Sequence, residues 1–204
     1  MQALFVHGMG RTPFSAWGLL RLLRGAGFET QTLGYCTALE DFDRISARLS
    51  SRIIRLARRG DYILIGHSLG GVLLRAALAA LPEGVAPPRH VFLVGSPVQP
   101  ARLAGLLQRN PLFRLLTRDC GQLLASRERM QQVASVNSPV TAIVGDRPVV
   151  LTQRFFGSEA NDGVVSTSET RADWLTDTVS VPVMHSFLPG SPRVAEVILR
   201  RLGR

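Results

Sequence analysis

The chain has 204 residues, of which 46% are hydrophobic and 19% are charged, and this balance excludes an intrinsically disordered protein. The formal net charge is +9, and the basic residues other than histidine are all arginines. The arginines are scattered and form no stripe interleaved with aromatic residues, so we expect no nucleic-acid partner. A basic surface is nevertheless compatible with peripheral contact with an anionic membrane.

The sequence contains no apolar run that approaches the roughly 20 residues needed to span a bilayer. Its first residues, MQALFVHGMG, lack the basic segment of a signal peptide, so we expect a cytoplasmic protein. The two cysteines, Cys36 and Cys120, lie far apart and lack metal-binding spacing, which favours free thiols over a disulfide.

Short apolar runs alternate with amphipathic segments, a pattern typical of a parallel sheet whose strands are joined by helices. We expect one α/β domain over residues 1–204. The predicted strands, in chain order, are Ala3–Val6, Glu29–Leu33, Tyr62–Ile65, Val91–Val94, Val140–Val144 and Thr178–Val183. The predicted helices are Ala16–Arg24, 42–59, Leu69–Leu81, Leu103–Leu116, Gln122–Val133 and Arg193–Leu202.

The segment between Gly95 and Pro139 is the least regular part of the sequence. It contains more leucine and phenylalanine than one buried helical stripe needs. We interpret this excess as ordinary packing of the connection between two strands, and the alternative is a cap over a substrate.

Gly66-His-Ser-Leu-Gly70 has the pattern G-x-S-x-G between a predicted strand and a predicted helix. A sharp turn from strand to helix strains the serine and brings neighbouring backbone so close that glycine is required around it. The turn also raises the hydroxyl above the sheet at the positive end of the helix. We therefore predict that Ser68 is a nucleophile.

A serine nucleophile needs a general base and an acid that orients it. His185 follows the last predicted strand, so it would reach the carboxyl edge of a parallel sheet, where Ser68 lies. We predict that His185 is the base. Asp162 and Asp146 both satisfy the chain order Ser…Asp…His; we favour Asp162 over Asp146, and Glu159 is a weaker alternative.

The loop His-Gly-Met-Gly at 7–10 follows the first predicted strand, and its glycines would let backbone N–H groups face a substrate oxygen. We expect Met9 and Leu69 to donate the two N–H groups of an oxyanion hole. The same loop lacks the third glycine of a dinucleotide-binding motif, so we do not expect a nucleotide there.

These motifs, together with Gly-Ser-Pro at 95–97 and Asn-Asp-Gly-Val-Val at 161–165, resemble the α/β-hydrolase superfamily and its small serine lipases and esterases. The resemblance implies an α/β-hydrolase fold with a minimal, mostly parallel sheet of about six strands and no large lid domain. It also supports Asp162 as the acid and the N–H groups of Met9 and Leu69 as the oxyanion hole.

The implied activity is hydrolysis of a small-molecule or lipid ester through an acyl-enzyme, with no metal or cofactor. Phe14, Trp17 and Val98 are candidates to line an acyl site, although core packing competes with that role for each. A thioesterase, an amidase or an acyltransferase would show the same triad, and a lipid-binding module without catalysis is a further alternative.

Overall fold

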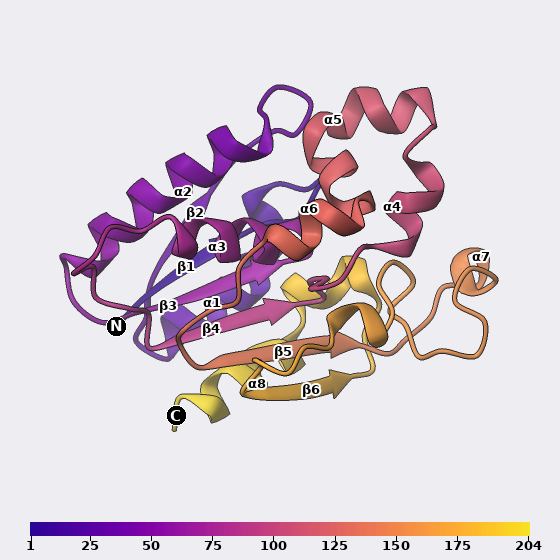
Figure 1. The fold of residues 1–204 in the computed structure, drawn as a ribbon. Coiled ribbons are helices and arrows are strands. Elements are labelled where there is room, and N and C mark those ends of the chain that lie inside the picture. The colour runs from indigo at the N-terminus through magenta and orange to yellow at the C-terminus, as the bar shows by residue number, and fades with distance from the viewer.

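The computed structural model describes residues 1–204 and contains one sheet of six strands, all parallel. The spatial order is β2-β1-β3-β4-β5-β6, so the chain first builds one side of the sheet and then returns past β1 to build the other. The strands are β1 (Gln2–Val6), β2 (Glu29–Leu33), β3 (Tyr62–His67), β4 (His90–Val94), β5 (Val140–Gly145) and β6 (Asp177–Val181). Because every pair is parallel, the carboxyl ends of the strands meet at a single edge (Figure 1).

Helices cover both faces of the sheet (Figure 1). One face is covered by α1 (Trp17–Gly25) and α8 (Pro192–Arg201), and the other by α2 (Phe42–Ala57) and α3 (Leu69–Ala79). The remaining helices are α4 (Arg102–Leu107), α5 (Pro111–Ala125), α6 (Arg127–Gln132) and the short α7 (Val150–Gln153). No helix combines the length and the apolar character needed to cross a bilayer. The predicted parallel sheet of six strands, flanked by helices and without a large lid domain, is confirmed.

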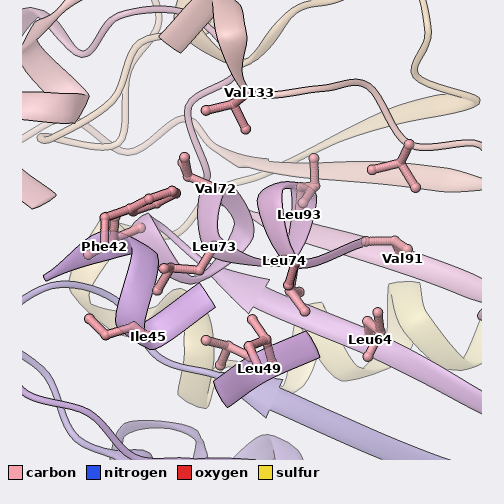
Figure 2. Close-up of a cluster of buried hydrophobic side chains, with 14 of the residues drawn as sticks. Phe42, Ile45, Leu49, Leu64, Val72, Leu73, Leu74, Val91, Leu93 and Val133 are labelled. Atoms are coloured by element: carbon pink, nitrogen blue, oxygen red, sulfur yellow. The ribbon is translucent and has the colours of Figure 1, made fainter. Parts of the chain in front are cut away.

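Alternate residues of each central strand enter two separate hydrophobic clusters, as the side-chain period of a strand requires. On β3, Leu64 packs under α2 and α3, whereas Ile63 and Ile65 pack under α1 and α8. Figure 2 shows the first cluster, in which side chains of α2 and α3 meet those of β3 and β4. Burial on both faces explains why the strands are almost continuously apolar.

The connection from β4 to β5 differs from the sequence prediction in its boundaries. The predicted helix Leu103–Leu116 is interrupted, because Asn110 caps a new helix by accepting hydrogen bonds from the backbone N–H groups of Leu112 at 3.0 Å and Phe113 at 3.1 Å. The second predicted helix, Gln122–Val133, is divided at Ser126, which caps α6 in the same way through the N–H of Arg129.

α5 bends sharply at Arg118, whose backbone angles are φ 43° and ψ −128°. Beyond the bend Cys120, Leu123 and Leu124 are buried in the core. The leucines before the bend and those of α4 do not follow the prediction of ordinary core packing, since the structure leaves five of them exposed. These are Leu106, Leu107, Leu112, Leu115 and Leu116.

Candidate active site

Ser68 occupies the sharp turn between β3 and α3, with φ 52° and ψ −124°. This region of backbone space is strained for a residue with a side chain. Its N–H donates to the carbonyl of Val94 on β4 at 3.0 Å, which fixes the turn to the sheet. A methyl group at Gly66 would lie 2.5 Å from the Cα of Gly71, and one at Gly70 would clash with the carbonyl oxygen of Val6. The glycines are therefore required by contact with neighbouring backbone.

His185 and Asp162 form a buried pair at the same edge of the sheet. His185 Nδ1 lies 2.7 Å from Asp162 Oδ2, and the backbone N–H of His185 donates to the carbonyl of Asp162 at 2.9 Å. The aspartate is 1% exposed and the histidine 7% exposed. Two contacts with one partner leave the imidazole little freedom, and they leave Nε2 as the ring nitrogen that can exchange a proton with a substrate.

The turn Asn161-Asp162-Gly163 holds the Asp162 carboxylate in place. Its Oδ1 accepts from the N–H groups of Val164 at 3.0 Å and Val165 at 2.8 Å, while Oδ2 faces His185. Gly163 has a φ of 94°, which a residue with a side chain rarely adopts. Both carboxylate oxygens are thus satisfied in a buried position, which a charged group requires.

The serine and the histidine reach this edge from different strands, β3 and β6. Glycines next to both residues leave room for the backbone segments to lie close together. A methyl group at Gly95 would lie 3.1 Å from both His185 Nδ1 and Asp162 Oδ2, and one at Gly8 would lie 3.0 Å from Ser68 Cβ. No hydrogen bond joins Ser68 Oγ to His185, and Ser68 is half-buried. Such contacts are often long without substrate and shorten when it binds.

The two other acidic candidates lie elsewhere. Asp146 is exposed after β5, where its carboxylate accepts from Ser180 Oγ at 2.6 Å. Glu159 pairs with Arg102 at 2.9 Å and accepts the N–H of Ser168 at 2.8 Å. Burial raises the pKa of Glu159, but hydrogen bonds from Ser168 and Arg102 together outweigh it and lower the pKa to about 2. Neither carboxylate contacts His185.

The structure also brings His67 to the site, which the sequence did not indicate. Its Nε2 lies 3.1 Å from the carbonyl oxygen of His185, and the two rings are 4.7 Å apart between centroids. Its Nδ1 is buried and has no hydrogen-bond partner. Burial, and then the charge of neighbouring His185, hold the pKa of His67 well below its ordinary value. His67 is therefore a neutral ring whose Nε2–H donates to His185.

The two predicted oxyanion donors belong to segments next to Ser68, namely the start of α3 and the loop after β1. Leu69 is the first residue of α3, so its N–H has no partner within the helix and points from the helix's positive end. Met9 follows Gly8, where an added methyl group would lie 3.0 Å from Ser68 Cβ, and the Met9 side chain packs partly buried against the core. The backbone N–H of Met9 donates to no protein acceptor.

The three candidates for substrate contact differ in exposure. Phe14 is 83% exposed in the 3-10 turn Pro13–Ala16, and Trp17 is 57% exposed at the start of α1. Val98 is 6% exposed and belongs to the core cluster under α2 and α3, so it offers little surface to a ligand.

The chain matches the sequence profile of the alpha/beta hydrolase family over residues 3–200. This match covers nearly the whole chain, and the chain therefore belongs to that family. No curated protein matches the chain significantly.

Solved structures of similar fold include lipases, esterases and thioesterases. The mature lipase BlEst2 from Bacillus licheniformis is 16% identical, with a TM-score of 0.76 over 98% of this chain and 91% of that chain. A metagenomic carboxyl esterase is also 16% identical, with a TM-score of 0.78 over 100% and 75% of the two chains. The thioesterase RedJ from the prodiginine pathway of Streptomyces coelicolor is 17% identical, with a TM-score of 0.67 over 99% and 85%. At these identities the likeness concerns the fold alone.

Proposed function

We propose that the protein hydrolyses carboxylic esters through a triad of Ser68, His185 and Asp162. The observation that carries the proposal is the buried contact of 2.7 Å between Asp162 and His185 at the edge where Ser68 occupies a strained turn. A buried carboxylate that fixes the tautomer of a histidine beside a serine in a strained strand-to-helix turn is the arrangement of a serine hydrolase.

In the proposed reaction, Ser68 Oγ attacks the ester carbonyl and its proton passes to Nε2 of His185. Asp162 holds the ring with Nδ1 protonated and stabilises the imidazolium that forms. The N–H groups of Met9 and Leu69 stabilise the negative oxygen, each contributing about 3–4 kcal/mol as in comparable sites. His185 then protonates the leaving alcohol, and water, activated by the same histidine, releases the acid from Ser68.

The test is hydrolysis of p-nitrophenyl esters with short to long acyl chains by the wild type and Ser68→Ala. We expect the variant to lose about 10⁴-fold or more in kcat while remaining folded by circular dichroism. The dependence on acyl length then separates an esterase from a lipase. A folded wild type that cleaves no ester of the series would contradict the proposal.

The matched pair Asp162→Asn and Asp146→Asn identifies the acid. Asp162→Asn should reduce kcat by about 10⁴-fold because the amide cannot hold His185 in the required tautomer. Asp146→Asn should leave kcat within about twofold, since Asp146 is exposed and contacts only Ser180. Equal losses in the two variants would show that a different group orients His185.

Thioester hydrolysis is the second candidate, because a thioesterase is among the proteins of similar fold. The same catalytic groups would act on either acyl donor. A comparison of kcat/KM for an acyl p-nitrophenyl ester and a thioester with the same acyl chain decides between them. Preference for the thioester would assign that activity while keeping the roles of Ser68, His185 and Asp162.

A further inference from the structure

Large exposed apolar side chains are concentrated in the connections at the carboxyl edge of the sheet. α7 exposes Val150 and Leu151, and Phe187 is exposed two residues after His185. α4 and the part of α5 before its bend expose five leucines, Leu106, Leu107, Leu112, Leu115 and Leu116. α4 and α5 pack on each other, and Figure 1 shows both of them, and α7, beyond the strand ends. Clustered exposed apolar side chains of this kind mark an interaction surface rather than ordinary solvent-facing residues.

Within these connections, two stretches bounded by Asp119, Asp146 and Glu159 carry positive charge without negative charge. Residues 102–118 contain Arg102, Arg109, Arg114 and Arg118 but neither aspartate nor glutamate. Residues 147–158 contain Arg147 and Arg154 and again no acidic residue. Only Arg102 and Arg118 form ion pairs, with Glu159 at 2.9 Å and with Asp41 at 3.8 Å respectively. The other four guanidinium groups form no ion pair within the chain, and of these only that of Arg154 lies over an aromatic ring, 4.7 Å from the centroid of Phe155.

We propose that residues 102–118 and 147–158 form a docking surface for an anionic lipid bilayer. Exposed leucines beside unpaired arginines are the composition of segments that lie in the membrane interface. There the apolar side chains enter the acyl boundary, and the guanidinium groups meet lipid phosphates. Arginine suits the second role because its planar guanidinium binds phosphate oxygens bidentately. Charge complementarity thus selects an anionic bilayer over an uncharged apolar partner.

Docking in this way would orient the candidate active site toward the lipid. The docking surface follows β4 and β5, and Ser68 follows β3, which is the neighbour of β4 in the sheet. Phe187, beside His185, lies exposed at the same edge. Membrane binding requires no turnover, so it holds or fails independently of the proposed hydrolysis.

The test is co-sedimentation of the full chain carrying Ser68→Ala with vesicles, because this variant prevents cleavage during the assay. Vesicles of phosphatidylcholine alone are compared with vesicles that also contain phosphatidylglycerol. We expect binding to the anionic vesicles, weakening as ionic strength rises. Added to this background, Arg109→Gln with Arg114→Gln should weaken the apparent affinity about 30-fold, and Leu115→Ser should weaken it about tenfold.

Matched controls lie away from the proposed surface. Arg55→Gln with Arg58→Gln removes the same charge from the C-terminal end of α2, near the amino edge of the sheet, where neither side chain forms an ion pair. Leu22→Ser removes an exposed leucine from α1. Both should bind the anionic vesicles within about twofold of the parent, because their side chains lie outside the docking surface.

Three results would overturn the proposal. One is the absence of binding to anionic vesicles by a folded protein. Another is an equal loss of affinity in the α2 arginine pair and in the Arg109 and Arg114 pair, which would indicate attraction by net charge alone. The last is a protein that binds no vesicles but forms a dimer in sedimentation velocity, which Leu115→Ser dissociates. The exposed leucines would then pack against a second copy of the chain.

Discussion

The imidazole of His67 lies against that of His185, and its Nε2 is 3.1 Å from the His185 carbonyl oxygen. His67 is therefore a positioning residue that fixes the backbone of the proposed base. Replacing it with leucine should reduce kcat about tenfold with little change in KM, because one hydrogen bond that holds His185 is lost. Steady-state kinetics on an ester substrate measures both constants.

His67→Gln is the control for that substitution, because its amide nitrogen reaches approximately where Nε2 lies and can donate to the same carbonyl. It should recover most of the lost kcat. If the leucine and glutamine variants are equally slow while both stay folded, the hydrogen bond is not what positions His185.

The free energy of unfolding should fall as the pH is lowered from 7.5 to 5. Burial lowers the pKa of His67, His7 and His90 below the ordinary value. The unfolded chain takes up protons near pH 6.5, whereas the folded chain takes them up only at lower pH, so each such histidine reduces stability by up to about 1.4 kcal/mol per pH unit below 6.5 until it is protonated in the folded chain as well. Urea unfolding at several pH values measures the slope.

His67→Gln removes one of these three histidines. The free energy of unfolding should then fall less steeply as the pH is lowered, by up to the contribution of one bound proton. The effect of the lowered carboxylate pKa values of Glu40, Asp119 and Glu159 appears only at more acidic pH, where those groups titrate in the unfolded chain. Constant stability between pH 7.5 and 5 would show that the three histidines accept protons in the folded state.

Gly70→Ala should destabilise the protein by about 1–3 kcal/mol, because the new methyl group meets the carbonyl oxygens of Val6 and His7. Gly105→Ala is the matched control, since no atom lies within 4 Å of its added methyl group and it lies inside α4. That change should be neutral or stabilise by up to about 1 kcal/mol. Thermal unfolding compares them, and equal effects would argue against the tight contact at the turn.

Periodicity and spacing were sufficient to predict the sheet. The predicted strand Glu29–Leu33 is confirmed, and β1, β3, β4 and β5 begin or end within two residues of their predicted limits. β6 ends at Val181, two residues early, because Pro182 cannot donate a hydrogen bond to the sheet. Nearly continuous apolar runs identify such strands because both faces of the sheet are covered.

The details of the site could not be read in the same way. The contact of His67 with His185 joins residues 118 positions apart in the sequence, and no local pattern encodes such a distance. The exposure of the leucines in α4 and α5 was also missed, because apolar composition alone does not distinguish a buried stripe from a surface for a partner. The predicted helices Leu103–Leu116 and Gln122–Val133 ran across the caps at Asn110 and Ser126, because a capping residue type alone does not fix where a helix begins.

Arg118 adopts a backbone conformation close to that of Ser68, and it is the only other non-glycine residue with positive φ. Arg118→Gly should stabilise the protein by about 1 kcal/mol by removing this strain. Arg114→Gly, in the regular part of α5, should destabilise by a similar amount. Chemical denaturation measures the change in the free energy of unfolding in each variant. Changes of opposite sign would establish the strain at Arg118, and destabilisation in both variants would refute it.

The bend at Arg118 also divides α5 into two parts in which mutations have different effects. Mutations beyond it meet the core through Cys120, Leu123 and Leu124, so most of them reduce the amount of folded protein. Mutations of the exposed leucines before it change side chains that the core does not need, so they should leave the amount of folded protein nearly unchanged. The exposed side chains from α4 to the bend are therefore constrained only by what they contact outside the chain, whereas the side chains beyond the bend are constrained by the core.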